Sequence, residues 1–96
     1  MRAAYVVSYD ICDPKRLRKV YKTMHGFGEH IQLSVFRCEL SATHLEKLIG
    51  KLEKIIHHRE DQVMIIYLGP ADGKSKKAIR TLGKAYKPAE REPQVF

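Results

Sequence analysis

The amino-acid sequence predicts an α+β fold in which two helices pack on one face of an antiparallel sheet. Strand-like and helix-like segments alternate along the chain, and each helical segment carries its apolar residues on one side only. The hydrophobic and charged fractions, 44% and 30%, are typical of a globular protein. Since 96 residues suffice for one small domain only, we expect residues 1–96 to form a single domain.

Residue periodicity marks the first strand and the first helix. Between Ala3 and Ile11 the side chains alternate between two faces that are both largely apolar, which predicts a strand. Asp13 and Pro14 then provide an N-cap and a proline at the first helical position. Apolar residues recur at helical spacing up to Gly26: Leu17, Val20, Tyr21 and Met24. We therefore expect a helix from about Pro14 to His25.

The central segment predicts two strands, a second helix and a further strand. Between His30 and Leu40 the apolar phase slips by one residue, which places a turn or bulge at Ser34. Ser41 is a good N-cap for a second helix, whose apolar stripe ends near Ile56. Residues 62–68 are apolar on both faces and predict another strand.

The element order is strand, helix, strand, strand, helix, strand, which is the split βαβ or ferredoxin-like arrangement. We interpret residues 69–75 as a loop. For Lys77 to Leu82 we favour a short strand over a helical turn, because Gly83 and Pro88 leave little room for a helix. The expected fold is thus a ferredoxin-like βαββαβ sandwich with an extra C-terminal strand.

Two helices on one side leave the other sheet face without cover. The strand at residues 62–68 would expose apolar side chains there, which monomers seldom do over a contiguous area. We therefore expect a homodimer related by a two-fold axis. The apolar end Gln94-Val95-Phe96 predicts that residues 84–96 form a tail that packs on the partner subunit.

Several classes of protein are excluded or disfavoured. The longest apolar run, Val63 to Leu68, is far shorter than the roughly 20 residues that span a bilayer, so we expect no membrane association. The N-terminal residues lack an apolar signal core with a cleavage site. Cys12 and Cys38 alone form neither a disulfide framework nor a C-x-x-C metal motif. We therefore expect a cytoplasmic location.

The charge of the chain points to a polyanionic partner. The formal net charge is +7, and residues 41–61 are neutral overall while both flanking regions are basic. On the first helix, four basic residues lie at i, i+3, i+4 and i+7, opposite the apolar face: Lys15, Arg18, Lys19 and Lys22. We call these four residues the basic ridge. A solvated helix face is the alternative interpretation.

Two further observations favour a phosphate-binding role for this helix. Lys15 and Arg16 occupy its first turn, where the helix dipole disfavours cations by roughly 0.3 to 1 kcal/mol each. No acidic residue lies on the same helix face to compensate them.

Asp10 is the strongest single candidate for chemistry. It closes an apolar strand, so it is either a turn cap or a ligand held at the rim of the sheet. Asp13 already provides the helix N-cap. Mg²⁺ keeps several waters and commonly takes only one or two carboxylates from a protein. A two-fold axis near Asp10 would bring a second carboxylate.

Two other motifs are weaker. Gly69 to Ser75 resembles a phosphate-binding loop, but only three residues separate its glycines where the motif needs four, and Asp72 would oppose a phosphate. His57 and His58 are adjacent, so on a helix they would point about 100° apart and chelate a metal poorly. We favour capping of the helix C-terminus for these histidines.

Five segments together resemble the small CRISPR-associated endoribonuclease of the spacer-acquisition module: Tyr9-Asp10-Ile11, Lys15-Arg16-Leu17-Arg18-Lys19-Val20, Ile31-Gln32-Leu33-Ser34-Val35-Phe36, Leu82-Gly83 and Gln94-Val95-Phe96. The resemblance covers essentially the whole chain. It implies a ferredoxin-like homodimer, an Mg²⁺ ion shared by the two strand-ending aspartates, and an integrase as partner.

Carried over to this sequence, the resemblance makes Asp10 the metal ligand, with Tyr9 and Phe36 as its catalytic neighbours. Nucleic acid, either single-stranded RNA or duplex DNA, would contact Arg16 together with Lys15, Arg18, Lys19 and Lys22 of the ridge. His30, which stands where members often have arginine, would be a further nucleic-acid contact. The alternatives are a non-catalytic nucleic-acid-binding adaptor and a free-standing ribonuclease toxin of the same fold.

Overall fold

The computed structural model describes residues 1–84, so the predicted tail lies outside the described residues except for Lys84. The elements of the described part are, in chain order, β1 (Ala3–Asp10), α1 (Pro14–His25), β2 (Gly28–Gln32), β3 (Val35–Leu40), α2 (Ala42–Ile55), β4 (Gln62–Pro70) and α3 (Gly73–Lys76). The sheet has the order β2-β3-β1-β4, and all neighbouring strands are antiparallel. The predicted ferredoxin-like βαββαβ fold is confirmed.

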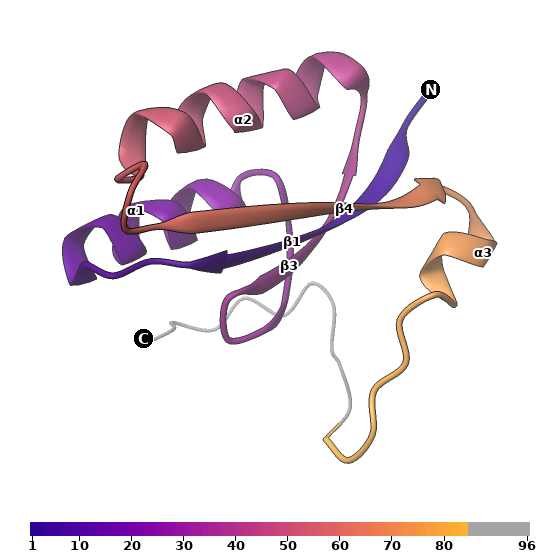
Figure 1. The fold of residues 1–96 in the computed structure, drawn as a ribbon. Coiled ribbons are helices and arrows are strands. Elements are labelled where there is room, and N and C mark those ends of the chain that lie inside the picture. Colours follow the sequence, from indigo (N-terminus) through magenta and orange to yellow (C-terminus); the bar gives the residue numbers. More distant parts are fainter. Residues whose placement is uncertain (85–96) are drawn as a thin grey trace.

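The helices α1 and α2 lie on the same side of the sheet, and α3 follows the far end of β4 (Figure 1). The core fills the space between these helices and the sheet. Val7 of β1, Phe36 of β3, Met24 of α1 and Leu48 of α2 are all fully buried in one cluster. The thiol of Cys38 belongs to the same cluster, and burial raises its pKa to about 12.

Local sequence signals set the helix starts and the turn between β2 and β3 as predicted. The Asp13 carboxylate accepts a hydrogen bond from the backbone N–H of Arg16 at 3.0 Å, and Pro14 opens α1. The Ser41 hydroxyl accepts from the backbone N–H of His44 at 3.2 Å and caps α2. Leu33 and Ser34 form the turn between β2 and β3, where the apolar phase slips.

The region after β4 differs from the sequence prediction. β4 continues to Pro70, and the Asp72 carboxylate accepts from the backbone N–H groups of Lys74 and Ser75, which starts the short helix α3 within the expected loop. The prediction of a strand between Lys77 and Leu82 is wrong, because the turn that ends α3 includes Lys77 and residues 79–82 form no regular element. Residues 71–84 therefore contribute no extra strand, and residues 85–96 lie outside the described part.

The sheet face opposite α1 and α2 is partly covered. Met64 and Ile66 of β4 are 50% and 42% exposed on this face. Arg37 of β3 is buried there: its Nη1 donates to Glu39 Oε2 at 2.7 Å and its Nη2 donates to Ser75 Oγ of α3 at 3.1 Å. The predicted exposure of apolar side chains therefore applies to β4. Among residues 1–84 we find no helix with the length and apolar character needed to cross a membrane.

Candidate nucleic-acid interface and metal site

Asp10 ends β1 with an exposed side chain, opposite Gln62 of β4. Within residues 1–84, no hydrogen bond or ion pair engages its carboxylate. No group of three or more histidine, cysteine, aspartate or glutamate side chains is placed to hold a metal in this part of the chain. Asp10 is thus an available oxygen ligand, and a cation held there would keep most of its own waters or need ligands from another chain.

Tyr9 and Phe36 lie on the other face of the sheet from Asp10. Side chains alternate along a strand, and both aromatic residues belong to the core beneath α1 and α2, with ring centroids 6.3 Å apart. Burial raises the pKa of Tyr9 to about 12, so its phenol stays neutral over the physiological range. The structure does not bring these two residues together with Asp10. It places them in the core between the helices and the sheet, where they support the strand that carries Asp10.

The basic ridge is fully formed on α1. All four of its residues are exposed, whereas Val20, Tyr21 and Met24 on the opposite side of the helix are buried. The first turn of α1 contains no acidic residue. The ridge therefore presents four cations to solvent along about two turns of helix, where they can contact successive phosphates.

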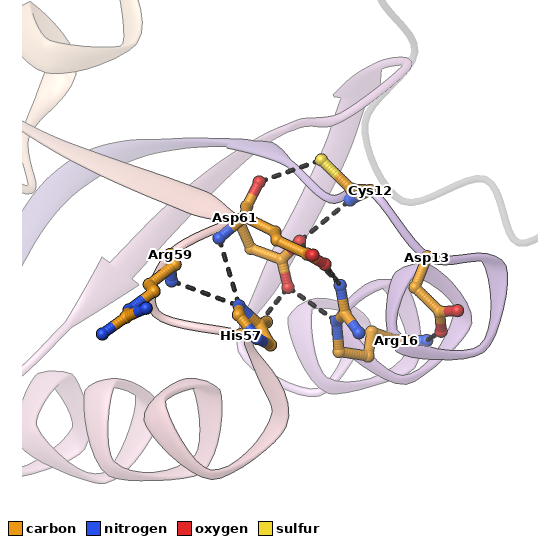
Figure 2. Close-up of polar contacts among 7 residues, drawn as sticks. Cys12, Asp13, Arg16, His57, Arg59 and Asp61 are labelled. Carbon is orange, nitrogen blue, oxygen red and sulfur yellow. Dashed lines mark hydrogen bonds and ion pairs between the residues drawn. The ribbon is translucent and has the colours of Figure 1, made fainter.

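Arg16, the fifth predicted phosphate contact on α1, has a different place. Its Nε donates to Asp61 Oδ2 at 2.7 Å, and its Nη2 donates to Asp61 Oδ1 and to Glu60 Oε1, both at 3.2 Å (Figure 2). Since the charge of Arg16 is paired inside the protein, its main role in this structure is to join α1 to the segment before β4.

Asp61 is the centre of this polar cluster, and the sequence analysis missed it. Its carboxylate also accepts from the backbone N–H groups of Cys12 at 2.9 Å and His57 at 2.7 Å (Figure 2). The hydrogen bonds from Arg16 and from these two N–H groups hold the pKa of Asp61 well below its usual range. An acidic residue directly before an apolar strand was the one available signal.

The histidines lie outside the ridge. His30 of β2 is half-buried against Tyr21 and Phe36, with ring centroids 5.3 Å and 4.9 Å apart, and its Nε2 lies 2.7 Å from the Leu33 carbonyl oxygen. His57 follows the C-terminus of α2. Its Nδ1 accepts from the backbone N–H groups of Arg59 and Glu60, so the ring caps the next turn. A direct phosphate contact by His30 remains a prediction.

The described part of the molecule is a small ferredoxin-like protein with a basic helix and an exposed carboxylate at the end of its first strand. The chain belongs to the CRISPR associated protein Cas2 family, whose model matches residues 2–83. This finding confirms the family that the sequence resembles.

Relatives and solved structures agree with this assignment. A CRISPR-associated endoribonuclease Cas2 of Rhodospirillum rubrum is 45% identical over 97% of this chain and 90% of its own length. The corresponding protein of Geobacter sulfurreducens is 42% identical over 99% of both chains. The crystal structure of a hypothetical protein from Thermus thermophilus matches 92% of this chain and 99% of its own with a TM-score of 0.77 and 31% identity. That of Streptococcus pyogenes Cas2 covers 83% and 99% with a TM-score of 0.72 and 27% identity.

Proposed function

We propose that this protein is an Mg²⁺-dependent endonuclease that cleaves RNA or DNA and that, as a homodimer, binds nucleic acid beside an integrase during CRISPR spacer acquisition. The observation that carries the proposal is the exposed, unpaired carboxylate of Asp10, which ends β1 shortly before the basic ridge begins. The endoribonuclease names of the relatives from Rhodospirillum rubrum and Geobacter sulfurreducens support the reaction class.

The division of labour follows from where the side chains lie. Asp10 fits an Mg²⁺ ligand because its carboxylate is exposed and has no partner within residues 1–84. The bound ion would lower the pKa of a water and stabilise charge on the phosphate. The ridge binds and orients the phosphodiester chain. Hydrolysis then adds one water across a single P–O bond and leaves a phosphate on one fragment and a hydroxyl on the other.

A homodimer supplies what one chain lacks. Each chain brings one candidate carboxylate, and a two-fold axis near Asp10 would pair it with its symmetry mate. The exposed Met64 and Ile66 on the face opposite the helices favour such contact, because a partner would remove them from water.

A non-catalytic adaptor is the second candidate. It is favoured by the isolation of Asp10, since the described residues offer no preformed cluster of metal ligands. An adaptor needs the ridge to bind nucleic acid but does not need Asp10.

Asp10→Asn separates the two functions. The amide keeps the size of the side chain and removes the charge that attracts Mg²⁺. We expect wild-type protein to cleave labelled single-stranded RNA or duplex DNA with Mg²⁺ and not with chelator, and Asp10→Asn to bind both nucleic acids but to cut neither. Asp13→Asn is the matched control, because Asp13 is a helix cap. This variant should still cleave nucleic acid with Mg²⁺.

Equal cleavage by wild type and Asp10→Asn would overturn the metal assignment. If wild-type protein cuts nothing with Mg²⁺ but still binds duplex DNA and an integrase, the adaptor function holds and the nuclease function fails.

A further inference from the structure

A second basic surface lies outside the residues assigned above. It is a groove of about 570 Å³ between α2 and the turn that follows α1. The described residues that line it include Arg2, Phe27, His44, Lys47, Lys51 and Lys54, and no carboxylate is among them. We call this feature the α2 groove.

The charge of α2 is segregated, although the segment 41–61 is neutral overall. At about 100° per residue, Lys47, Lys51 and Lys54 fall within an arc of about 60°. Glu46 and Glu53 lie together about 120° away from the centre of that arc. The lysines therefore present their charge to the groove, while the glutamates that balance it in the sequence face elsewhere.

An aromatic ring lies among these cations. Phe27 is half-buried in the wall of the groove, and Lys51 Nζ lies 5.6 Å from the centre of its ring. Proteins that bind single-stranded nucleic acid combine a positive groove for the phosphates with an aromatic ring on which a base can stack. The bases of a duplex are already stacked on each other, so a ring at this place would gain little from duplex DNA.

The length of the basic row fits a short stretch of strand. Lys47 and Lys54 are seven residues apart, which is about 10 Å along the axis of α2. At the axial rise of about 3.4 Å per nucleotide of a stacked strand, this row would follow about three nucleotides.

We infer that the α2 groove binds single-stranded nucleic acid, with its three lysines on consecutive phosphates and the Phe27 ring against a base that displaces Lys51 from the ring. The inference rests on the proposed function, because it gives a nucleic-acid-binding protein a second contact surface. It differs from the ridge in its ligand: the ridge binds any phosphate backbone, and the groove requires an unpaired base.

The lysines are tested by charge removal at two places. The triple variant Lys47→Gln, Lys51→Gln, Lys54→Gln removes the groove charge, and Lys74→Gln, Lys77→Gln, Lys84→Gln removes three exposed charges elsewhere. Binding of fluorescent oligo-U and oligo-dT 12-mers and of a 12-base-pair duplex is measured by anisotropy from 50 to 200 mM salt. We expect the groove variant to bind both single strands at least tenfold more weakly than the control variant does.

The salt dependence gives a second readout. Three lost phosphate contacts should flatten the slope of log K against log salt by about 2 for single strands, and duplex binding should be alike in the two variants. Equal losses in both variants overturn the inference. Wild-type protein that binds duplex but no single strand overturns it too and leaves the proposed function standing, whereas wild-type protein that binds neither overturns both.

Stacking on Phe27 is tested without relying on charge. A strand that carries 2-aminopurine loses fluorescence when that base stacks, so wild-type protein should quench it. Phe27→Leu keeps an apolar side chain in the groove wall, should abolish the quenching and should weaken binding by about fivefold or more. A urea midpoint near that of wild type verifies folding of the variant. An unquenched strand bound to wild-type protein contradicts the stacking.

Discussion

Arg16 Nε donates to Asp61 Oδ2 over 2.7 Å, and this contact joins two turns that are 45 residues apart in the sequence. The Asp61 side chain has no exposed surface, whereas Arg16 retains about a quarter of its own. The pair fixes the first turn of α1 against the segment that leads into β4. It therefore sets the position from which the basic ridge faces solvent.

Asp61→Asn should destabilise the protein strongly. The substitution removes the charge that Arg16 and two backbone N–H groups engage, and removing one side of this partly buried ion pair leaves the other side uncompensated. We expect the free energy of unfolding in urea to fall by about 3 kcal/mol. Glu60→Gln is the matched control, because Glu60 is exposed and its Oε1 lies 3.2 Å from Arg16 Nη2. This variant should lose less than about 1 kcal/mol of unfolding free energy. Similar losses in both variants would contradict the central role of Asp61.

The stability that Asp61 contributes should depend on pH. The pKa of this carboxyl is lower in the folded protein than in the unfolded chain, so its contribution is complete above the unfolded value of about 3.9 and is lost as pH falls through the folded value. Urea midpoints of wild type and Asp61→Asn at pH 7, 5 and 3 should therefore differ by similar amounts at pH 7 and 5 and by a smaller amount at pH 3. A difference that stays constant down to pH 3 would rule out this linkage.

Replacement of the basic ridge should weaken nucleic-acid binding without regard to sequence. Four glutamines at Lys15, Arg18, Lys19 and Lys22 remove exposed charges only, so the urea midpoint should hardly change. Phosphate contacts release counterions, and four lost contacts should flatten the salt slope for duplex DNA by about 3 to 4.

The control for the ridge is a variant with glutamine at Lys74, Lys77, Arg80 and Lys84, which lowers the net charge equally at exposed positions. Anisotropy titrations with two unrelated duplexes compare the variants. If the ridge variant keeps the wild-type slope, the ridge is a solvated face.

Two glycines should respond to alanine in opposite directions. At Gly28 a Cβ would lie 2.5 Å from Cys38 Sγ and 2.6 Å from the Arg37 carbonyl oxygen, so β2 and β3 would have to separate. We expect Gly28→Ala to lower the stability by about 1 to 3 kcal/mol. Gly50 lies in α2 with open space around it, and Gly50→Ala should raise the stability by up to about 1 kcal/mol. Thermal unfolding of both variants provides the comparison.

The proposed homodimer makes a prediction about mass in solution. Sedimentation at micromolar concentration should give about twice the 11.1 kDa of one chain. Met64→Lys and Ile66→Lys place charges on the exposed apolar face and should shift the equilibrium toward monomer, whereas Glu53→Lys on α2 should not. A wild-type monomer at that concentration would refute a dimer held by this face.

Local signals predicted much of the fold. Asp13, Pro14 and Gly26 bound α1 because capping and proline geometry act within one turn, and the phase slip at Ser34 marks the turn between β2 and β3 because register has a period of two. The strand predicted at residues 77–82 is not formed: the Asp72 cap starts α3, the turn that ends this helix includes Lys77, and residues 79–82 form no regular element.

The candidate site was less accessible to sequence reasoning. The ridge follows from helical spacing alone. The pairing of Arg16 with Asp61 depends on a contact across 45 residues, which no local rule reveals, and the α2 groove depends on Phe27 and α2 coming together in three dimensions. Alternation along β1 implied that Tyr9 and Asp10 point to opposite faces, and the structure places Tyr9 in the core accordingly.

The two thiols of the chain have very different access to solvent, so their rates of alkylation report two different processes. Cys12 is exposed, so an alkylating reagent reaches it in the native state. Cys38 has no exposed surface and a pKa of about 12, so it reacts only when the sheet opens away from the helices. The slow labelling phase therefore reports opening of the core, and the fast phase reports the chemical reactivity of the exposed Cys12 thiol. Mass spectra taken during a time course of alkylation would report both phases from the two native thiols.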